Sequence, residues 1–257
     1  MRTVAKSLTD ALGLVALALM RSLGSLRSPV VWFYLLAPAA AAFFIWMGLA
    51  IWGVGAVVDW LLANPPMTLL ASWGLIWLAN LLAWLGGWMA IFAAAYLTTA
   101  LLAAILVMPL MLRHLAQGEY ADVAPLGADS FVAATVNSLW AAFLFIAAWL
   151  ATVPLWLIPG LGLLLPLLLM AWFNRRTFAY DALAQHANAG EWEVLRREQR
   201  QAMFLLGLLV AVLAHLPFVG LLVPALAALA YVHLGLEALR RLRGEALMVG
   251  EARLVSD

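Results

Sequence analysis

A proline–glycine pattern that occurs twice constrains this chain more than any other feature. One copy spans residues 159–166 and the other 217–224, each inside an apolar stretch too long for a single membrane crossing. Proline lacks a backbone donor and clashes with the preceding helical turn, so each copy predicts a helix break. Repeated broken helices in a membrane protein are typical of a transport site. The predicted helix-break residues are Pro159, Gly162, Pro166, Pro217, Gly220 and Pro224.

The composition indicates an integral membrane protein. Hydrophobic residues make up 67% of the chain and charged residues 11%, whereas a soluble domain is about a quarter charged. The long apolar stretches are 30–63, 69–112, 131–173 and 202–236. We therefore expect an all-α integral membrane protein, with two long crossing helices and two Pro/Gly-broken helical hairpins. The hairpins are either re-entrant or paired spans.

We predict a single membrane domain over residues 1–243. Its predicted parts are an interfacial helix at 7–26, long helices at 30–63 and 69–117, hairpins at 131–180 and 202–239, and then a cytoplasmic tail at 244–257. An uncleaved short anchor is the alternative for residues 7–26, because no cleavage site follows their apolar segment.

The distribution of charge predicts the orientation in the membrane. All 14 Lys and Arg fall within residues 2–27, at Arg113, within 175–200 and within 240–253. The positive-inside rule therefore places both termini and both long polar connections in the cytoplasm. Each hairpin must then start and end on the same side. The leading arm 202–216 reaches only about 22 Å, against a hydrocarbon core of about 30 Å, so its tip is predicted to stop inside the membrane.

The second apolar stretch allows two arrangements. A turn at Gly86-Gly87 would give two ordinary spans, whereas one long helix would keep four tryptophans on a single face. These are Trp73, Trp77, Trp84 and Trp88. We favour the long helix and interpret the tryptophans as packing residues. A line of small residues, at Ala95, Thr99 and Ala103, predicts a close contact within the chain or between subunits.

No catalytic, metal-binding or nucleotide-binding pattern is apparent. The chain has no cysteine, no paired-histidine motif and no glycine-rich phosphate loop. We expect no enzyme activity, no cofactor, no metal site and no nucleic-acid partner. His215 lies just before Pro217 and is expected to satisfy a carbonyl freed by the break. His233 and Glu237 are expected to form a local polar pair.

Arginines at the helix ends are the candidates for binding an anion. Arg27 and Ser28 precede Pro29, which suits a first helical turn. A helix start carries partial positive charge and arginine offers a planar fork, so together they suit an oxyanion. Snorkelling to lipid phosphate is the alternative, and taken alone it is favoured for Arg27, as for Arg175 and Arg176.

These residues give the chain a resemblance to the CysZ-type sulfate permease family, which is grouped with the etoposide-induced membrane protein family. The resemblance rests on Leu26-Arg27, on the end of the second long helix at 109–119, on residues 173–181 and on the two hairpin tips. It implies a bacterial inner-membrane protein that assembles as an oligomer and admits sulfate to the cytoplasm.

The resemblance also places a family element on this chain. The anion-binding Gly-Leu-Arg of the family falls on Ser25-Leu26-Arg27, with serine in place of glycine. Gly220 stands where the family commonly has asparagine. The segment around Ala187-Asn188-Ala189-Gly190 also differs, which is consistent with a divergent branch.

We therefore expect a multi-pass permease or channel for sulfate or a related oxyanion. Its anion-binding candidates are Ser25, Leu26, Arg27 and Ser28, and its pathway candidates are Arg113, Glu119, Arg175, Arg176 and His215. The expected partners are membrane lipid, a small inorganic oxyanion and further copies of the chain in a homo-oligomer. A non-transporting membrane scaffold or assembly protein is the alternative, favoured by the few polar residues at membrane depth.

Overall fold

The computed structural model describes residues 2–127, 131–158, 160–216 and 219–256, and these residues form helices, turns and loops with no strand. The helices, in chain order, are α1 (Arg2–Ser25), α2 (Pro29–Leu62), α3 (Met67–Ser72), α4 (Ile76–Leu102), the π-helix η1 (Ala103–Val107), α5 (Met108–Gln117), α6 (Phe131–Thr152), the 3₁₀-helix η2 (Val153–Leu157), α7 (Leu161–Asn174), the π-helix η3 (Arg175–Ala179), α8 (Tyr180–Ala184), α9 (Ala189–Glu198), α10 (Arg200–Leu213) and α11 (Val223–Ser256). Five helical runs in the described part are long and apolar enough to cross a membrane. The predicted all-α membrane fold is confirmed.

The first two long helices form an antiparallel pair closed by α3. α2 begins at Pro29, which needs no donor in the first turn. Gly74 adopts a left-handed φ of 79° between α3 and α4, a conformation that glycine adopts without steric cost. The second long helix therefore begins at Ile76 rather than at the predicted Leu69. From Ile76 it continues through η1 and α5 to Gln117.

The tryptophans of this helix are not packing residues within the chain. Trp73 lies outside the helix, as the C-cap of α3. The exposed fractions of Trp73, Trp77 and Trp84 are 71%, 67% and 46%, so these three do not pack inside the chain, and their packing against a second copy stays a prediction. They form an aromatic surface on the outer end of the α2–α4 pair. The small-residue line, by contrast, is buried inside the chain, and its members are Ala95, Thr99 and Ala103.

The first proline–glycine copy reverses the chain at the start of its pattern. Gly160 has a left-handed φ of 84° and caps α7, which begins at Leu161. α7 then runs through Gly162 and Pro166, so neither residue breaks a helix. A proline inside a helix removes one donor and clashes with the carbonyl four residues back, here on Gly162. The surrounding helix tolerates this single loss, and the predicted break at Pro166 is wrong.

The second copy reverses the chain through a longer turn. α10 ends at Leu213, and Pro224 is the second residue of α11, where a missing donor costs nothing. A Cβ on Gly220 would lie 2.5 Å from the carbonyl oxygen of Ala214, so only glycine fits this close approach. The predicted break residues Pro159 and Pro217 lie outside the described residues.

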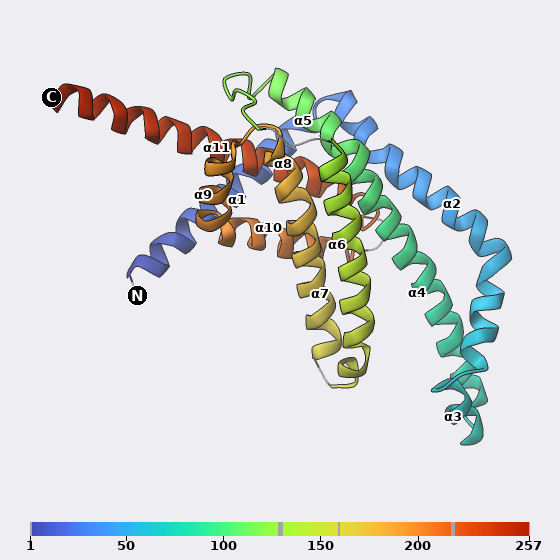
Figure 1. Ribbon diagram of the computed structural model, residues 1–257. Coiled ribbons are helices and arrows are strands. Elements are labelled where there is room, and N and C mark those ends of the chain that lie inside the picture. Colours follow the sequence, from blue (N-terminus) through green and yellow to red (C-terminus); the bar gives the residue numbers. More distant parts are fainter. Residues whose placement is uncertain (1, 128–130, 159, 217–218, 257) are drawn as a thin grey trace.

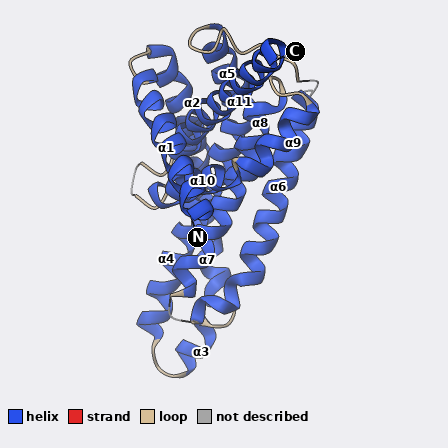
Figure 2. Cartoon of the chain, turned by 90° about the vertical axis from the view of Figure 1, so that its left-hand side faces the viewer, coloured by secondary structure: helices blue, strands red, loops and turns tan. Residues whose placement is uncertain are grey.

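The α2–α4 pair and the α6–α7 pair extend in the same direction, with α3 and the η2–α7 turn at their far ends (Figures 1 and 2). α1, α10 and α11 run crosswise to them near the opposite end (Figures 1 and 2). α1 packs into this crosswise layer with one buried face. The residues of that face are Ala11, Leu14, Val15 and Ala18. This layer holds most of the core, while the two long pairs carry most of the exposed apolar side chains.

Candidate functional site

The turn at the end of α7 is held by side-chain hydrogen bonds. α7 widens into the π-helix η3, which carries Arg175 and Arg176. Thr177 Oγ1 donates to the carbonyl of Phe173 at 2.9 Å. Asn137 Nδ2, on the neighbouring α6, donates to the carbonyl of Arg176 at 3.2 Å. The backbone from which the two arginines project is therefore fixed from two sides.

These arginines line a hollow of about 320 Å³. We call it the arginine hollow and define it by Asn137, Trp172, Arg175, Arg176, Trp192 and Arg196. Tyr180, also in the lining, packs edge-on against Trp192 with ring centroids 5.6 Å apart. The hollow thus combines three guanidinium groups with a wall of large aromatic rings.

Positive charge in the arginine hollow is only partly compensated. Arg196 forms an ion pair with Glu193, with Nη2 2.8 Å from Oε1. Among the described residues, Arg175 and Arg176 have no carboxylate partner. Arg175 is half-buried, and its pKa is lowered, first by burial and then by the charge of Arg200. A half-buried cation beside like charges is stabilised when an anion joins it.

The predicted anion-binding element at the start of α2 is only partly assembled. Arg27 is exposed and forms no ion pair or side-chain hydrogen bond with the described residues. The Ser28 side chain does not cap α2. The backbone N–H groups of Arg27 and Ser28 already donate to the carbonyls of Gly24 and Ser25, at 3.2 and 3.0 Å. The donors left for an anion are those of the first turn of α2, beside the Arg27 guanidinium.

Ser25 and Leu26 do not face an anion at this helix start. Ser25 Oγ donates to the carbonyl of Arg21 at 3.1 Å and lies 2.9 Å from His233 Nε2. The carbonyl of Leu26 accepts from Trp32 Nε1 at 2.8 Å. Both residues shape the α1–α2 junction.

The other pathway candidates lie apart from the arginine hollow. Arg113 is exposed on α5. Glu119 forms an ion pair with Arg21, with Oε1 2.9 Å from Nη1. His215 Nδ1 lies 2.8 Å from the carbonyl oxygen of Ala211, the structural use expected of it near a helix end. None of the three lines the hollow.

A buried charge network joins α1, the loop after α5, and α11. Arg21 Nη1 donates to the Tyr120 hydroxyl at 3.1 Å. That hydroxyl lies 2.9 Å from His233 Nδ1, and the other ring nitrogen faces Ser25. Burial raises the pKa of Tyr120 to about 12. The Tyr120 phenol therefore stays neutral and links the two helices through hydrogen bonds.

Glu237 belongs to the same charge network. Its Oε1 accepts from Arg241 Nε at 3.0 Å, and its Oε2 lies 3.3 Å from Arg21 Nη1, an ion pair without hydrogen-bond geometry. His233 and Glu237 are thus linked through Arg21 and Tyr120 rather than directly. Sequence reasoning missed Arg21 and Tyr120. An arginine within an apolar helix was the available signal, but it was counted only toward membrane orientation.

Comparison with known proteins places these residues in a family. A family model described as "Sulfate transporter CysZ/Etoposide-induced protein 2.4" matches residues 18–224. The match includes Arg27 and the whole arginine hollow, and it stops at the second residue of α11. No curated protein matches the chain. The chain belongs to the sulfate transporter CysZ/etoposide-induced protein 2.4 family, as the resemblance predicted.

Proposed function

We propose that the chain is a permease or channel for sulfate or a related oxyanion, with the arginine hollow as a binding site on its route. Membership in a sulfate-transporter family supports an anion as the solute and lipid as the surroundings. The observation that carries the proposal is Arg175, a half-buried arginine beside like charges and without a carboxylate among the described residues.

The chemistry of the hollow suits a tetrahedral oxyanion. Guanidinium groups offer N–H donors in a planar fork that matches two oxygens of such an anion. Arg175 and Arg176 are consecutive residues of the π-helix, and both line the hollow. The rings of Trp172 and Trp192 form part of the wall of the hollow. Attraction between the arginines and the anion is stronger where water is excluded.

Arg27 is proposed as a second anion contact. Its guanidinium has no partner among the described residues, and the first-turn N–H groups of α2 lie beside it. In this proposal Arg27 and the helix start attract the anion, and the arginine hollow binds it. We also propose a homo-oligomer, in which the exposed aromatic surface of the α2–α4 pair is available to a second copy or to lipid.

We further propose a bacterial inner membrane with both termini in the cytoplasm. The far ends of the α2–α4 and α6–α7 pairs, at α3 and η2, contain no Lys or Arg. The arginines gather near the crosswise layer at the opposite end, on η3, α9 and α11 (Figure 1). The positive-inside rule puts that layer on the cytoplasmic side.

Flux of labelled sulfate into proteoliposomes tests the proposal. The double change Arg175→Ala and Arg176→Ala should lower uptake tenfold or more, since a charged hydrogen bond contributes about 1.5–3 kcal/mol. Arg197→Ala is the matched control, because Arg197 lies on α9 next to Arg196 but outside the hollow. Wild-type uptake no greater than that of empty liposomes, or full uptake by the double variant, would refute the proposal.

A membrane scaffold is the second candidate. One observation favours it: charged side chains of the charge network are paired within the chain, as in Arg21–Glu119 and Arg241–Glu237. A scaffold predicts no flux of sulfate, molybdate or phosphate in the same liposomes, together with a folded and oligomeric protein. The flux assay therefore separates the two functions.

A further inference from the structure

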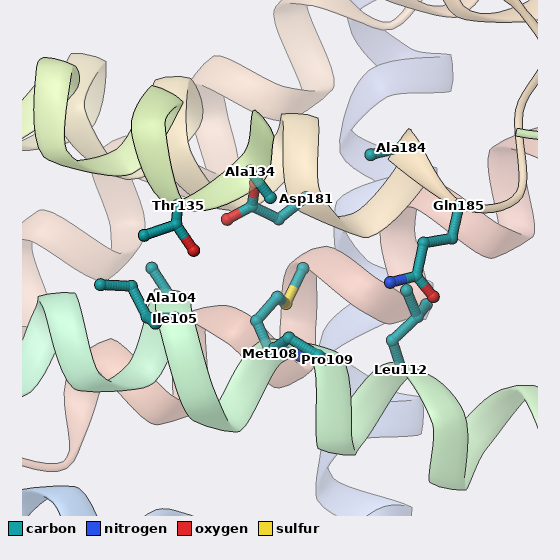
Figure 3. Close-up of a pocket in the computed structure, with 10 residues that line it drawn as sticks. All are labelled: Ala104, Ile105, Met108, Pro109, Leu112, Ala134, Thr135, Asp181, Ala184 and Gln185. Carbon is teal, nitrogen blue, oxygen red and sulfur yellow. The ribbon is translucent and has the colours of Figure 1, made fainter. Parts of the chain in front are cut away.

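A small cavity lies between the helix run α4–η1–α5 and the helices α6 and α8 (Figure 3). Its volume is about 20 Å³, which is room for one water-sized particle. Ala104, Ile105 and Pro109 line it from one side, and Thr135 and Asp181 line it from the other (Figure 3). The arginine hollow does not include this cavity.

Asp181 projects its carboxyl group toward this cavity (Figure 3). Only 6% of the residue is exposed. Its Oδ2 accepts from Ser138 Oγ at 3.3 Å, while its Oδ1 has no hydrogen-bond partner among the described residues. Burial raises the pKa of this carboxyl to about 8. No arginine, lysine or histidine of the described chain pairs with it, so its negative charge lacks compensation from the protein.

Other oxygen atoms without partners surround the cavity. Thr135 Oγ1 is buried and has no hydrogen-bond partner in the described chain. Pro109 has no N–H, so one carbonyl in the turn before it, on Ala104 or Ile105, loses its helical donor. That turn is the π-helix η1, and π-turns are frequent at functional sites. Carbonyls freed in this way coordinate small cations in membrane transporters.

We propose that this cavity is a sodium site formed by Asp181 Oδ1, Thr135 Oγ1 and the backbone carbonyl released at Pro109. Asp181 and Thr135 present oxygen atoms to the cavity, and the Gln185 amide in its lining adds an oxygen beside its N–H donors. One carboxylate balances one positive charge. A divalent cation needs more oxygen ligands and more charge than one carboxylate supplies. A cavity for one small particle suits sodium better than an organic cation.

The sodium site goes beyond anion permeation but lies close to it. Asp181 follows Arg175 on the continuous helical run of η3 and α8. A cation at Asp181 would fix that run against η1 and so stabilise the backbone that carries the hollow. Stability measured without sulfate tests the sodium site, whereas flux tests the proposed function. Failure of one experiment therefore leaves the other result intact.

The test is thermal unfolding of the purified protein in nanodiscs at about pH 8.5, above the folded-state pKa of Asp181. Sodium chloride is compared with choline chloride at equal ionic strength. Sodium should raise the unfolding temperature saturably, by about 2 °C or more, and Asp181→Asn should abolish the rise. Asp59→Asn is the matched control, because Asp59 is exposed and should keep the full sodium response.

A second pair of variants keeps the test informative if Asp181→Asn does not fold. Thr135→Val removes the hydroxyl while preserving shape and should weaken the apparent sodium affinity several-fold, whereas Thr135→Ser should retain it. Equal unfolding temperatures in sodium and choline would overturn the proposal. A response to pH without any response to sodium would also overturn it, since the carboxyl would then hold only a proton. A sodium response that persists in both Asp181→Asn and Thr135→Val would place the ion elsewhere.

Discussion

The α6–α7 and α10–α11 hairpins share one sequence pattern at their tips but differ in their surroundings. In the most apolar window of α6 17% of the residues are buried, whereas in that of α11 the share is 89%. α6 exposes large side chains such as Trp140 and Phe143. The corresponding stretch of α11 is enclosed by α1, α10 and η3. The tip pattern thus predicts that the chain reverses. It does not predict how far other helices cover the hairpin.

In both hairpins, small side chains lie where helices meet. α11 places four alanines in its first two turns, and all are buried. They are Ala225, Ala227, Ala228 and Ala230. Small residues let neighbouring helices approach closely. α6 also contains several alanines, of which Ala141 and Ala142 are buried while Ala147 and Ala151 are exposed, so other helices cover only part of it.

The arginines of the two hairpins near the crosswise layer also differ. On α11, Arg240 Nε donates to Asp122 Oδ2 at 2.7 Å, and Arg243 Nε donates to Glu191 Oε1 at 2.8 Å. At the end of α7, Arg175 has no such partner in the described chain. One hairpin uses its arginines to hold the fold together, while Arg175 on the other has no carboxylate partner among the described residues.

The largest test of this contrast truncates one apolar residue on each hairpin. Leu206 on α10 is fully buried and Phe143 on α6 is 58% exposed. Leu206→Ala should lower the free energy of unfolding by about 2–4 kcal/mol, because it leaves a cavity. Phe143→Ala should change it by about 0.5 kcal/mol or less. Denaturant titration in mixed micelles measures both, and equal losses would mean that a partner chain covers α6.

A smaller effect is expected where the two hairpins cross. A Cβ on Gly207 of α10 would lie 2.6 Å from the carbonyl oxygen of Ala171 on α7 and 2.8 Å from the Tyr231 hydroxyl. Gly207→Ala should therefore destabilise the protein by about 1–3 kcal/mol through overpacking. The same titration measures it.

Gly48→Ala is the control for this crossing. Nothing lies within 4 Å of a Cβ at Gly48, so the change should stabilise α2 by up to about 1 kcal/mol. Similar results for the two variants would contradict the close crossing of α7 and α10.

Sequence reasoning predicted the helical stretches because hydrophobicity and proline placement are local properties. The start of α2 at Pro29 and the start of α11 beside Pro224 follow from the missing proline donor alone. The same reasoning was wrong at Pro166, since a helix with good neighbours tolerates one lost hydrogen bond. It also missed Gly74, whose left-handed φ lies between α3 and α4 and separates the two helices.

The candidate site was predictable only in part. Arg175 and Arg176 stood out as a charged pair after an apolar run, but the sequence favoured snorkelling to lipid. That Arg196 and two tryptophans join them depends on how α9 packs against α10 and α11, which no local pattern encodes. The partners of Asp181 and of Arg21 come from distant segments for the same reason. Contacts between distant segments arise from the packing of whole helices.

A third prediction concerns the hydrogen bond that closes the α10–α11 hairpin. The Tyr231 hydroxyl donates to the carbonyl of Met203 at 2.7 Å, and the ring is fully buried. Tyr231→Phe should cost about 1 kcal/mol. It should also lessen the cost of Gly207→Ala, because the hydroxyl is one of the atoms that a new Cβ meets. A double-mutant cycle measures this coupling, and Tyr34→Phe, half-buried on α2, serves as the control.

The smallest expected effect is a pH dependence of stability that comes from the contact between Arg243 on α11 and Glu191 on α9. The hydrogen bond from Arg243 lowers the pKa of Glu191 below its usual value. The stability it contributes is therefore present above the unfolded-state pKa of about 4.3 and is lost as pH falls through the folded-state pKa. Arg243→Gln should lower the free energy of unfolding more at pH 6 than at pH 3.5. The difference between the two pH values should be about 1 kcal/mol or less.

Arg196→Gln is the matched control for this pH dependence. Arg196 forms its ion pair with Glu193 on the exposed side of α9, where water screens the attraction. The free energy of unfolding of this variant should follow the wild-type pH dependence within error. If both variants changed the pH dependence alike, the Arg243 pair would be no more than a surface contact. The contrast between the paired arginines of α11 and Arg175, which lacks a carboxylate partner in the described chain, would then have no energetic basis.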